Sequence, residues 1–258
     1  MGTAQARTLE FSGYEWIVKT SDGEQVGPGP NYFSDSEENV WVDSEGRLHL
    51  KIMQRDGRWY CAEVISTENF GYGTYRFYTE SRIDQIDQNA VLGLFTWDDD
   101  PAYHHREIDI EFSRWGQTEN DNAQFVVQPY TKSDNIHRFN VELSDTHSTH
   151  SFDWKSDEVF FQSTHGDYIE SWSYYIDQDI PLPGNENARM NLWLFGGEPP
   201  SEAVEVIVSA FEFIPVGTPP QPPPVSPDAI PEPTTLFLMG MGLFGVLLLG
   251  RRRLNLSK

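Results

Sequence analysis

The chain has 258 residues, with 40 acidic and 18 basic side chains and a net charge of −22. Four basic residues lie in the last eight positions, so residues 1–215 hold 14 basic and 38 acidic side chains, a net charge of −24. A domain with this much negative charge repels a phosphate backbone, which argues against nucleic-acid binding. The 35 aromatic residues exclude a disordered chain.

Residues 1–8 contain no apolar segment, yet Ala4-Gln5-Ala6 has the A-x-A form found at signal-peptidase sites. We expect that the recorded start is internal, or that a signal was trimmed, and that the mature chain begins near Arg7. An in-frame upstream segment that is first charged and then apolar would support this expectation.

From Leu9 to Pro215 short runs alternate apolar and polar residues, which is typical of β-strands, and no helical apolar period is seen. The lone Cys61 excludes an intrachain disulfide, and its strand-like run predicts a buried core residue. Many short strands predict an all-β fold, an antiparallel β-sandwich in one domain over residues 9–215. The pattern predicts strands at residues 48–52, 59–65, 73–81, 91–97, 107–112, 124–128, 138–143, 159–162, 189–194 and 204–214.

The most informative strand runs from Glu107 to Phe112 (Glu-Ile-Asp-Ile-Glu-Phe). Successive side chains of a strand point to opposite faces, so Glu107, Asp109 and Glu111 share one face and the apolar residues enter the core. Neighbours on one face are about 6.6 Å apart, so the carboxylates repel one another and the pKa of at least one rises. This cost indicates a functional site; a solvated outer strand is the alternative.

Two chemistries fit this row of acids. Glycoside hydrolysis needs two carboxyl groups at the scissile bond, one of them protonated. A metal site competes because His104 and His105 precede the strand. Adjacent histidines on an extended segment point to opposite sides, so at most one can join the acidic face, and a solvated loop is the simpler interpretation.

Several segments resemble glycoside hydrolase family 16, the β-jelly-roll glucanases. Residues 107–112 resemble its catalytic signature, and others follow in the family's order and spacing over residues 10–215. These are residues 71–75 (Gly-Tyr-Gly-Thr-Tyr), 93–97 (Gly-Leu-Phe-Thr-Trp), 150–154 (His-Ser-Phe-Asp-Trp) and 190–193 (Met-Asn-Leu-Trp). The resemblance implies a concanavalin A-like jelly roll and a glycosidase.

By this resemblance Glu107 is the nucleophile, Glu111 is the general acid and base, and Asp109 tunes the ionisation of Glu107. The resemblance also implies retention of configuration. The spacing permits it if both glutamates lean inward, because their Cα atoms are about 13 Å apart and a retaining pair needs about 5–5.5 Å. The motif lacks the extra residue of laminarinase-like members, which favours a mixed-linkage β-1,3-1,4-glucan or a glucan that contains β-1,4 bonds.

The resemblance also suggests substrate-binding residues. Trp97 and Trp193 match the family's cleft tryptophans, whose flat faces pack on sugar rings. Gln124 and Gln128 share one face of the next predicted strand and can hydrogen-bond a glucan. Asn31 resembles the asparagine of the family's N-terminal cleft loop.

The sequence departs from the licheninases at three positions. Val126 and Arg76 stand where licheninases commonly carry Asn and an acid, and Gln128 replaces an aromatic residue. These departures concern linkage specificity and leave the catalytic glutamates untouched. We expect that no cofactor is required. Family members often bind a structural calcium ion, and an acidic domain suits one, but the sequence has no EF-hand spacing.

A tail follows the predicted domain. Eight of the 17 prolines lie in residues 216–233, a composition that favours an extended spacer. Pro231-Glu232-Pro233 leads to an uncharged run at residues 236–249 and then to Arg251-Arg252-Arg253. Fourteen helical residues rise about 21 Å, and flanking residues extend this toward the roughly 30 Å of a bilayer core.

Residues 234–258 and the preceding Pro-Glu-Pro resemble the PEP-CTERM sorting signal of Gram-negative bacteria. The resemblance implies export to the cell surface or medium, transient anchoring by a transmembrane helix, and removal of the tail by a membrane sorting protease. We therefore expect a secreted, monomeric, endo-acting β-glucanase. A transglycosylase on the same site and a non-catalytic polysaccharide-binding matrix protein are the alternatives; the intact acidic row argues against the second.

Overall fold

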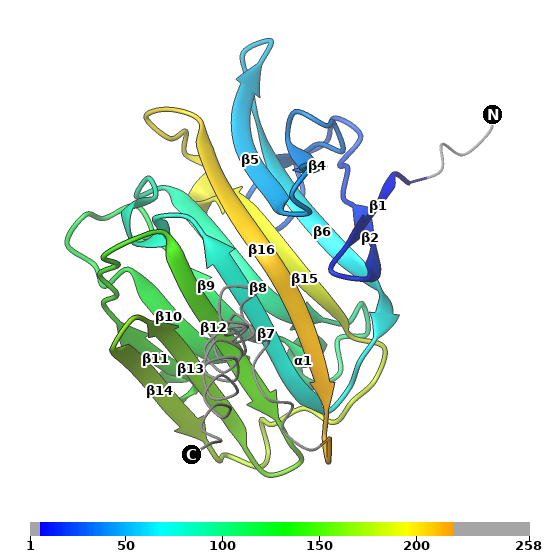
Figure 1. Ribbon diagram of the computed structural model, residues 1–258, viewed down its shortest axis with the longest axis vertical. Coiled ribbons are helices and arrows are strands. Elements are labelled where there is room, and N and C mark those ends of the chain that lie inside the picture. The colour runs from blue at the N-terminus through cyan, green and yellow to red at the C-terminus, as the bar shows by residue number, and fades with distance from the viewer. Residues whose placement is uncertain (1–5, 219–258) are drawn as a thin grey trace, which may run out of the picture. The chain divides into compact units, whose positions relative to one another are not determined.

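The structure is a computed structural model that describes residues 6–218. In this part of the chain, strands pair antiparallel except where β3 meets β6 (Figure 1). The strands are β1 (Thr8–Phe11), β2 (Tyr14–Val18), β3 (Tyr32–Phe33), β4 (Val40–Val42), β5 (Leu48–Arg55), β6 (Arg58–Asn69), β7 (Gly73–Glu80), β8 (Ala90–Trp97), β9 (Ile108–Phe112), β10 (Ala123–Val127), β11 (Ile136–Phe139), β12 (His147–Trp154), β13 (Val159–His165), β14 (Tyr168–Tyr174), β15 (Asn187–Leu194) and β16 (Val204–Pro215).

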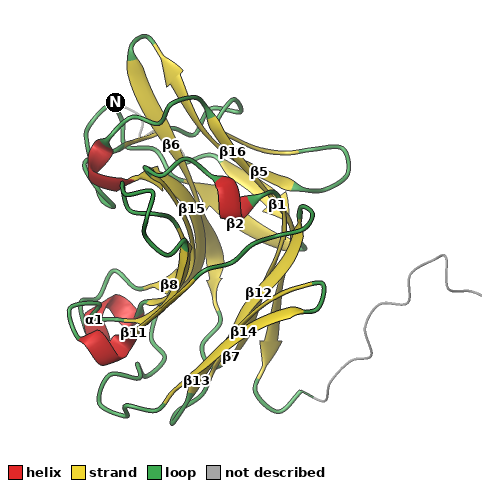
Figure 2. Ribbon diagram, turned by 90° about the vertical axis from the view of Figure 1, so that its left-hand side faces the viewer, coloured by secondary structure: helices red, strands yellow, loops and turns green. Residues whose placement is uncertain are grey.

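The strands form two packed layers, seen edge-on in Figure 2. One layer has the order β11-β10-β9-β8-β15-β6, and the other has the order β5-β16-β7-β12-β13-β14. The hairpin between β5 and β6 joins the layers, while β2 extends the first layer beside β6 and β4 extends the second beside β5. This arrangement confirms the predicted all-β antiparallel sandwich.

The core lies between the layers, as the alternation of β9 predicts. Ile108, Ile110 and Phe112 are fully buried on its inner face. Across the interior, Phe125 of β10 packs on Phe161 of β13 with ring centroids 5.1 Å apart. Cys61 is also fully buried, as predicted. The opposite face of β9 is therefore left free to carry polar groups.

Two long strands, β12 and β14, are not predicted by the apolar pattern. The inward face of β12 carries Ser148 and His150 besides its aromatic residues, and these polar groups are buried in hydrogen bonds to one another and to Ser163. Strand β14 forms the edge of its layer and alternates half-buried with exposed positions over most of its length. Both patterns hide the apolar alternation by which a strand is recognised.

The strand predicted at residues 138–143 is wrong at both ends, because β11 spans Ile136–Phe139. Beyond β11 the backbone is bound by side chains instead of by a neighbouring strand. The amide oxygen of Asn122 accepts the N–H of Val141 at 2.8 Å, and Asp84 accepts that of Leu143 at 3.2 Å. The apolar residues here are buried without belonging to the sheet.

Residues 6–218 contain no helix with the length and apolar character needed to cross a bilayer. The described chain therefore gives no support to a transmembrane helix. The apolar run predicted to form one, at residues 236–249, lies outside the described residues.

Candidate active site

The segment before the acidic strand is a turn and not extended chain, which corrects the expectation for the two histidines. Residues Tyr103–Arg106 (α1) all have φ between 51° and 65°, the left-handed region. The carboxylate of Asp98 holds the turn closed through Arg106 at 3.0 Å, and its backbone carbonyl accepts Nδ1–H of His105 at 2.8 Å. Extended backbone resumes at Glu107, and neither histidine lines the cavity described next.

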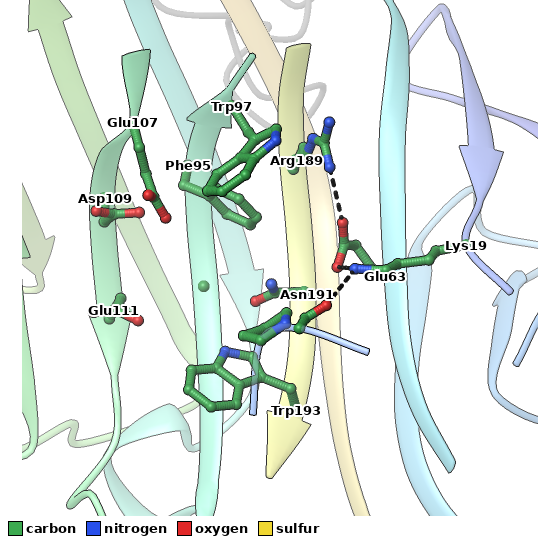
Figure 3. A pocket seen from close by; sticks show the side chains of 13 residues that line it. Lys19, Glu63, Phe95, Trp97, Glu107, Asp109, Glu111, Arg189, Asn191 and Trp193 are labelled. Carbon is green, nitrogen blue, oxygen red and sulfur yellow. Dashed lines mark hydrogen bonds and ion pairs between the residues drawn. The ribbon is translucent and has the colours of Figure 1, made fainter. Parts of the chain in front are cut away.

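The three carboxylates predicted to share a face do line one cavity, of about 370 Å³ (Figure 3). Asp109 and Glu111 project from β9, and Glu107 is the residue that immediately precedes this strand. The cavity lies on the outer face of the first layer, away from the core. Strand geometry thus brings together the three acids that the sequence predicts as catalytic.

Two glutamines on β10 and just beyond it bind these acids. The side-chain amide of Gln124 donates to Oε2 of Glu111 at 2.6 Å, and that of Gln128 donates to Oδ2 of Asp109 at 3.1 Å. Gln124 is only 5% exposed, and neither glutamine lines the cavity. We expected both to bind the glucan directly; in this structure they hold the carboxylates instead.

All three carboxyl groups are harder to ionise than ordinary carboxyl groups. Burial, reinforced by the negative charge of Glu111, raises the pKa of Glu107 to about 8. Burial and both glutamates raise the pKa of Asp109 well above its usual value, and burial raises that of Glu111 against the hydrogen bond from Gln124. Asp109 also hydrogen-bonds Glu107, which lowers the pKa of Glu107 and raises that of Asp109.

Aromatic side chains form the walls of the cavity. Trp97 and Trp193 lie toward opposite ends, with Phe95 near Trp97 (Figure 3). One face of Trp97 is covered by His105, whose ring stacks on it at 4.1 Å and an interplanar angle of 8°. Arg189 also lies over this ring, with its guanidinium carbon 5.8 Å from the centroid, so the ring surface left for a ligand is limited. Trp154 does not contribute to these walls, because it is fully buried and its Nε1–H donates to the carbonyl of Pro181.

The wall opposite the acids holds an ionic cluster that sequence analysis missed. Glu63 of β6 is 1% exposed and pairs with Lys19 at 2.7 Å and with Arg189 of β15 at 3.4 Å. The sequence signal was a single acid in the apolar run of residues 61–65. Its partners lie 44 and 126 positions away, so only the sheet pairing brings them together.

The cavity floor belongs to a row of residues paired across six strands, of which Glu63, Asn191, Gly93 and Glu111 line the cavity. From β6 to β11 the row is Glu63, Asn191, Gly93, Glu111, Gln124 and Arg138. Gly93 keeps the floor open, because a Cβ atom there would lie 2.5 Å from Oδ1 of Asn191. That oxygen is buried and has no hydrogen-bond partner in the described chain, so it is available to a ligand hydroxyl.

Asn31 does not line this cavity. It is 3% exposed, and its amide donates to the carbonyls of Pro28 and Leu194 at 2.9 and 2.8 Å. It thereby ties a loop to the end of β15, and Gly27 and Pro28 of that loop do line the cavity. Within residues 6–218 no group of three or more His, Cys, Asp or Glu side chains is arranged to hold a metal ion.

Comparisons with known proteins bear on both parts of the chain. Residues 229–253 match the PEP-CTERM protein-sorting motif, which confirms the predicted signal for export and surface sorting in bacteria. No curated protein matches the sequence. Among solved structures, a β-glucanase of Bacillus licheniformis is 19% identical, with a TM-score of 0.55, over 76% of this chain and 91% of its own.

Two further solved structures have a similar fold. An immunostimulatory antigen and pseudo β-1,3-glucanase of Mycobacterium tuberculosis is 20% identical, with a TM-score of 0.58, over 75% of this chain and 88% of its own. A β-1,3-1,4-glucanase (lichenase) from a mouse hindgut metagenome is 18% identical, with a TM-score of 0.54, over 78% and 93%. The chain has the β-glucanase jelly-roll fold.

Proposed function

We propose that this protein is a retaining, endo-acting glycoside hydrolase of family 16 that cleaves a β-glucan outside the cell. The observation that carries the proposal is the row of Glu107, Asp109 and Glu111 on the floor of a cavity walled by tryptophans. Sugar rings pack on aromatic faces, and glycoside hydrolysis uses paired carboxyl groups of which one is protonated.

Two carboxyl groups on one face of the cavity support a two-step displacement. Glu107 attacks the anomeric carbon while Glu111 gives its proton to the leaving oxygen, and a glycosyl-enzyme ester forms on Glu107. Glu111 then takes a proton from water, which cleaves the ester and releases the sugar. The hydrogen bond from Asp109 lowers the pKa of Glu107 and so partly offsets the burial that favours the protonated form of this nucleophile. Burial favours the protonated acid that the first step requires.

The strand register supports a glucan that contains β-1,4 bonds. Strand β9 pairs with β8 and with β10 without a register shift, so Glu111 follows Asp109 without a bulge. This is the form expected of enzymes that act on mixed-linkage or β-1,4-containing glucans. The sorting motif at residues 229–253 supports action at the cell surface after export, with the tail as the substrate of a membrane sorting protease.

The proposal is tested by incubating the full-chain protein with lichenan, laminarin, xyloglucan, carboxymethyl-cellulose, agarose and carrageenan, and measuring reducing ends. We expect mixed-linkage lichenan to be cleaved, and its first product, observed by proton NMR, to be the β-anomer. Glu107→Gln and Glu111→Ala should each reduce the rate at least about 100-fold while glucan binding persists, because each removes a group that reacts.

Undiminished hydrolysis in either variant would refute the assigned roles, and an initial α-anomer would refute retention. Products longer than the substrate would identify a transglycosylase instead. Glucan binding without cleavage by the wild type would identify a polysaccharide-binding matrix protein.

A further inference from the structure

We propose that Arg138 is a positioning residue for Glu111 and acts through the side-chain amide of Gln124. The inference rests on the proposed function for the catalytic role of Glu111. Arg138 lies on β11, two strands from the reacting groups, and does not line the cavity. Its effect on Glu111 must therefore pass through β10.

The three residues lie side by side across neighbouring strands. Arg138 is paired with Gln124, and Gln124 is paired with Glu111, so their side chains share the outer face of the layer. Nε–H of Arg138 donates to Oε1 of Gln124 at 3.1 Å, and Nε2–H of Gln124 donates to Oε2 of Glu111 at 2.6 Å. The sheet register therefore builds a continuous hydrogen-bonded chain from the surface to the acid.

The order of donors and acceptors fixes which way the amide faces. A guanidinium has donors only, so the oxygen of Gln124 must face Arg138 and its nitrogen must face Glu111. Without Arg138 the amide is free to turn over, which would place two acceptor oxygens against each other. Arg138 thus determines whether Glu111 meets a donor or an acceptor.

This order also specifies the oxygen of Glu111 that holds the proton. Oε2 already accepts the hydrogen bond from Gln124, so the transferable proton resides on Oε1. The amide also prevents the carboxyl group from rotating. Proton transfer to a leaving oxygen depends on such alignment, and losses from small misplacement are large.

The guanidinium is itself held in place. Its central carbon lies 5.0 Å from the ring centroid of Trp115, which is a cation–π contact. Arg138 is exposed, so its remaining N–H groups can be hydrated and the desolvation cost of its charge is small.

The charges that face Glu111 come from several elements. Glu107 and Asp109 adjoin it on its own segment, Glu63 lies at the far end of the floor row, and Lys19 and Arg189 both pair with Glu63. The neighbour on β8 is Gly93 and brings no charge. Arg138 is the cation on the β10 side, and both its charge and the amide it orients lower the pKa of Glu111.

The test compares Arg138→Met with the wild-type full-chain protein. Uniform ¹³C-glutamate labelling follows the carboxyl carbon of Glu111, whose resonance is assigned by its loss in Glu111→Gln. We expect the titration midpoint of Glu111 to rise by about 0.5–1 pH unit in Arg138→Met, since a donor and a positive charge are lost. Gln124→Leu should also raise the midpoint, and adding Arg138→Met to it should raise the midpoint by less than Arg138→Met does alone, because only the charge of Arg138 is then still lost.

Activity provides a second, independent measurement. With lichenan, kcat/KM of Arg138→Met should fall at least about tenfold, because the leaving sugar needs a proton. With 2,4-dinitrophenyl β-cellobioside, kcat/KM should change less than about threefold, because that leaving group departs unprotonated. Arg58→Met is the matched control. Arg58 also covers an aromatic ring, that of Tyr32 at 5.1 Å, but it lies outside the hydrogen-bonded chain Arg138–Gln124–Glu111, here called the relay.

An unchanged Glu111 titration in Arg138→Met overturns the relay whether or not the protein cleaves any glucan. Equal losses on lichenan and on the aryl glycoside overturn the positioning role. If the wild type cleaves neither substrate while the Glu111 midpoint still rises in Arg138→Met, the proposed function fails and the relay stands.

Discussion

The acidic side chains of the site are stabilised by single, well-placed donors. Glu111 accepts from Gln124 and Asp109 accepts from Gln128, while Glu107 is hydrogen-bonded by Asp109. These bonds do not compensate fully for the burial of three carboxyl groups, since the pKa of each remains raised. The site therefore carries a cost in folding stability that depends on pH.

That cost predicts the behaviour of Glu107→Gln. The pKa of Glu107 is about 8 in the folded protein against an ordinary 4.5, so the folded state holds a proton more tightly than the unfolded state. Stability therefore falls as pH rises from about 4.5 through 8, and a glutamine, which does not titrate, escapes the loss. At pH 8.5 we expect the free energy of unfolding of Glu107→Gln to exceed that of the wild type by at least about 1 kcal/mol.

Thermal or urea unfolding between pH 4.5 and 8.5 measures this difference. The gain should be smallest at pH 4.5 and vanish below it, where the carboxyl group becomes protonated in both states. The exposed Glu202→Gln is the control and should show no such trend. A gain that is constant across this range would contradict the assignment.

How much of the site could be predicted depends on how locally each feature is encoded. Glu107, Asp109 and Glu111 belong to one short segment, so strand alternation alone places them on one face. The direction in which Gln124 points could not be predicted, because it depends on Arg138, 14 positions away. Likewise, the cluster of Lys19, Glu63 and Arg189 exists only once β2, β6 and β15 are paired.

At the scale of elements, the left-handed turn of α1 is the least regular part of the site. Each of its four residues adopts a conformation that costs a non-glycine residue roughly 1–2 kcal/mol. No apolar period signals such a turn, and for this reason the sequence suggested extended chain there. The strain is held by Asp98, which accepts hydrogen bonds from Arg106 and from the backbone N–H groups of Asp100 and Asn185.

Glycine removes this strain where no side chain is needed. His104 has a φ of 51° and is exposed, so His104→Gly should raise the free energy of unfolding by about 0.5–1 kcal/mol. The matched control is His147→Gly, which replaces an exposed histidine at an ordinary strand position in β12. Its free energy of unfolding should fall by about 0.5–1 kcal/mol.

Urea unfolding of the two variants provides the comparison. Loss of stability in both would show that the turn in solution is not left-handed at residue 104. Activity should be unaffected by His104→Gly, because His104 lies outside the cavity.

At the scale of the molecule, the domain carries a large uncompensated charge. Residues 1–215 hold 38 acidic and 14 basic side chains, and several of the basic ones, such as Lys19 and Arg106, are already committed to buried acids. The excess repels itself more strongly in the compact state than in the unfolded chain. Acidity is therefore a property of the whole body, of which the three acids of β9 are a small part.

Salt screens this repulsion. Raising NaCl from 20 to 500 mM shortens the Debye length severalfold, so we expect the melting temperature of the protein to rise by about 2–5 °C at pH 7. Differential scanning calorimetry measures the change, and KCl serves as a check that the effect is one of ionic strength. A lower melting temperature in salt would mean that favourable ion pairs outweigh the net repulsion.

The place of β16 governs when the domain can form. This strand is the last in the described chain, yet it lies between β5 and β7 in the middle of its layer (Figure 1). Until residues 204–215 have emerged, whether from the ribosome or on the far side of a membrane, two interior strands lack a neighbour and the layer cannot close. A chain that is still being made or threaded therefore stays unfolded almost to its end, which is the state in which a polypeptide can pass through a narrow channel.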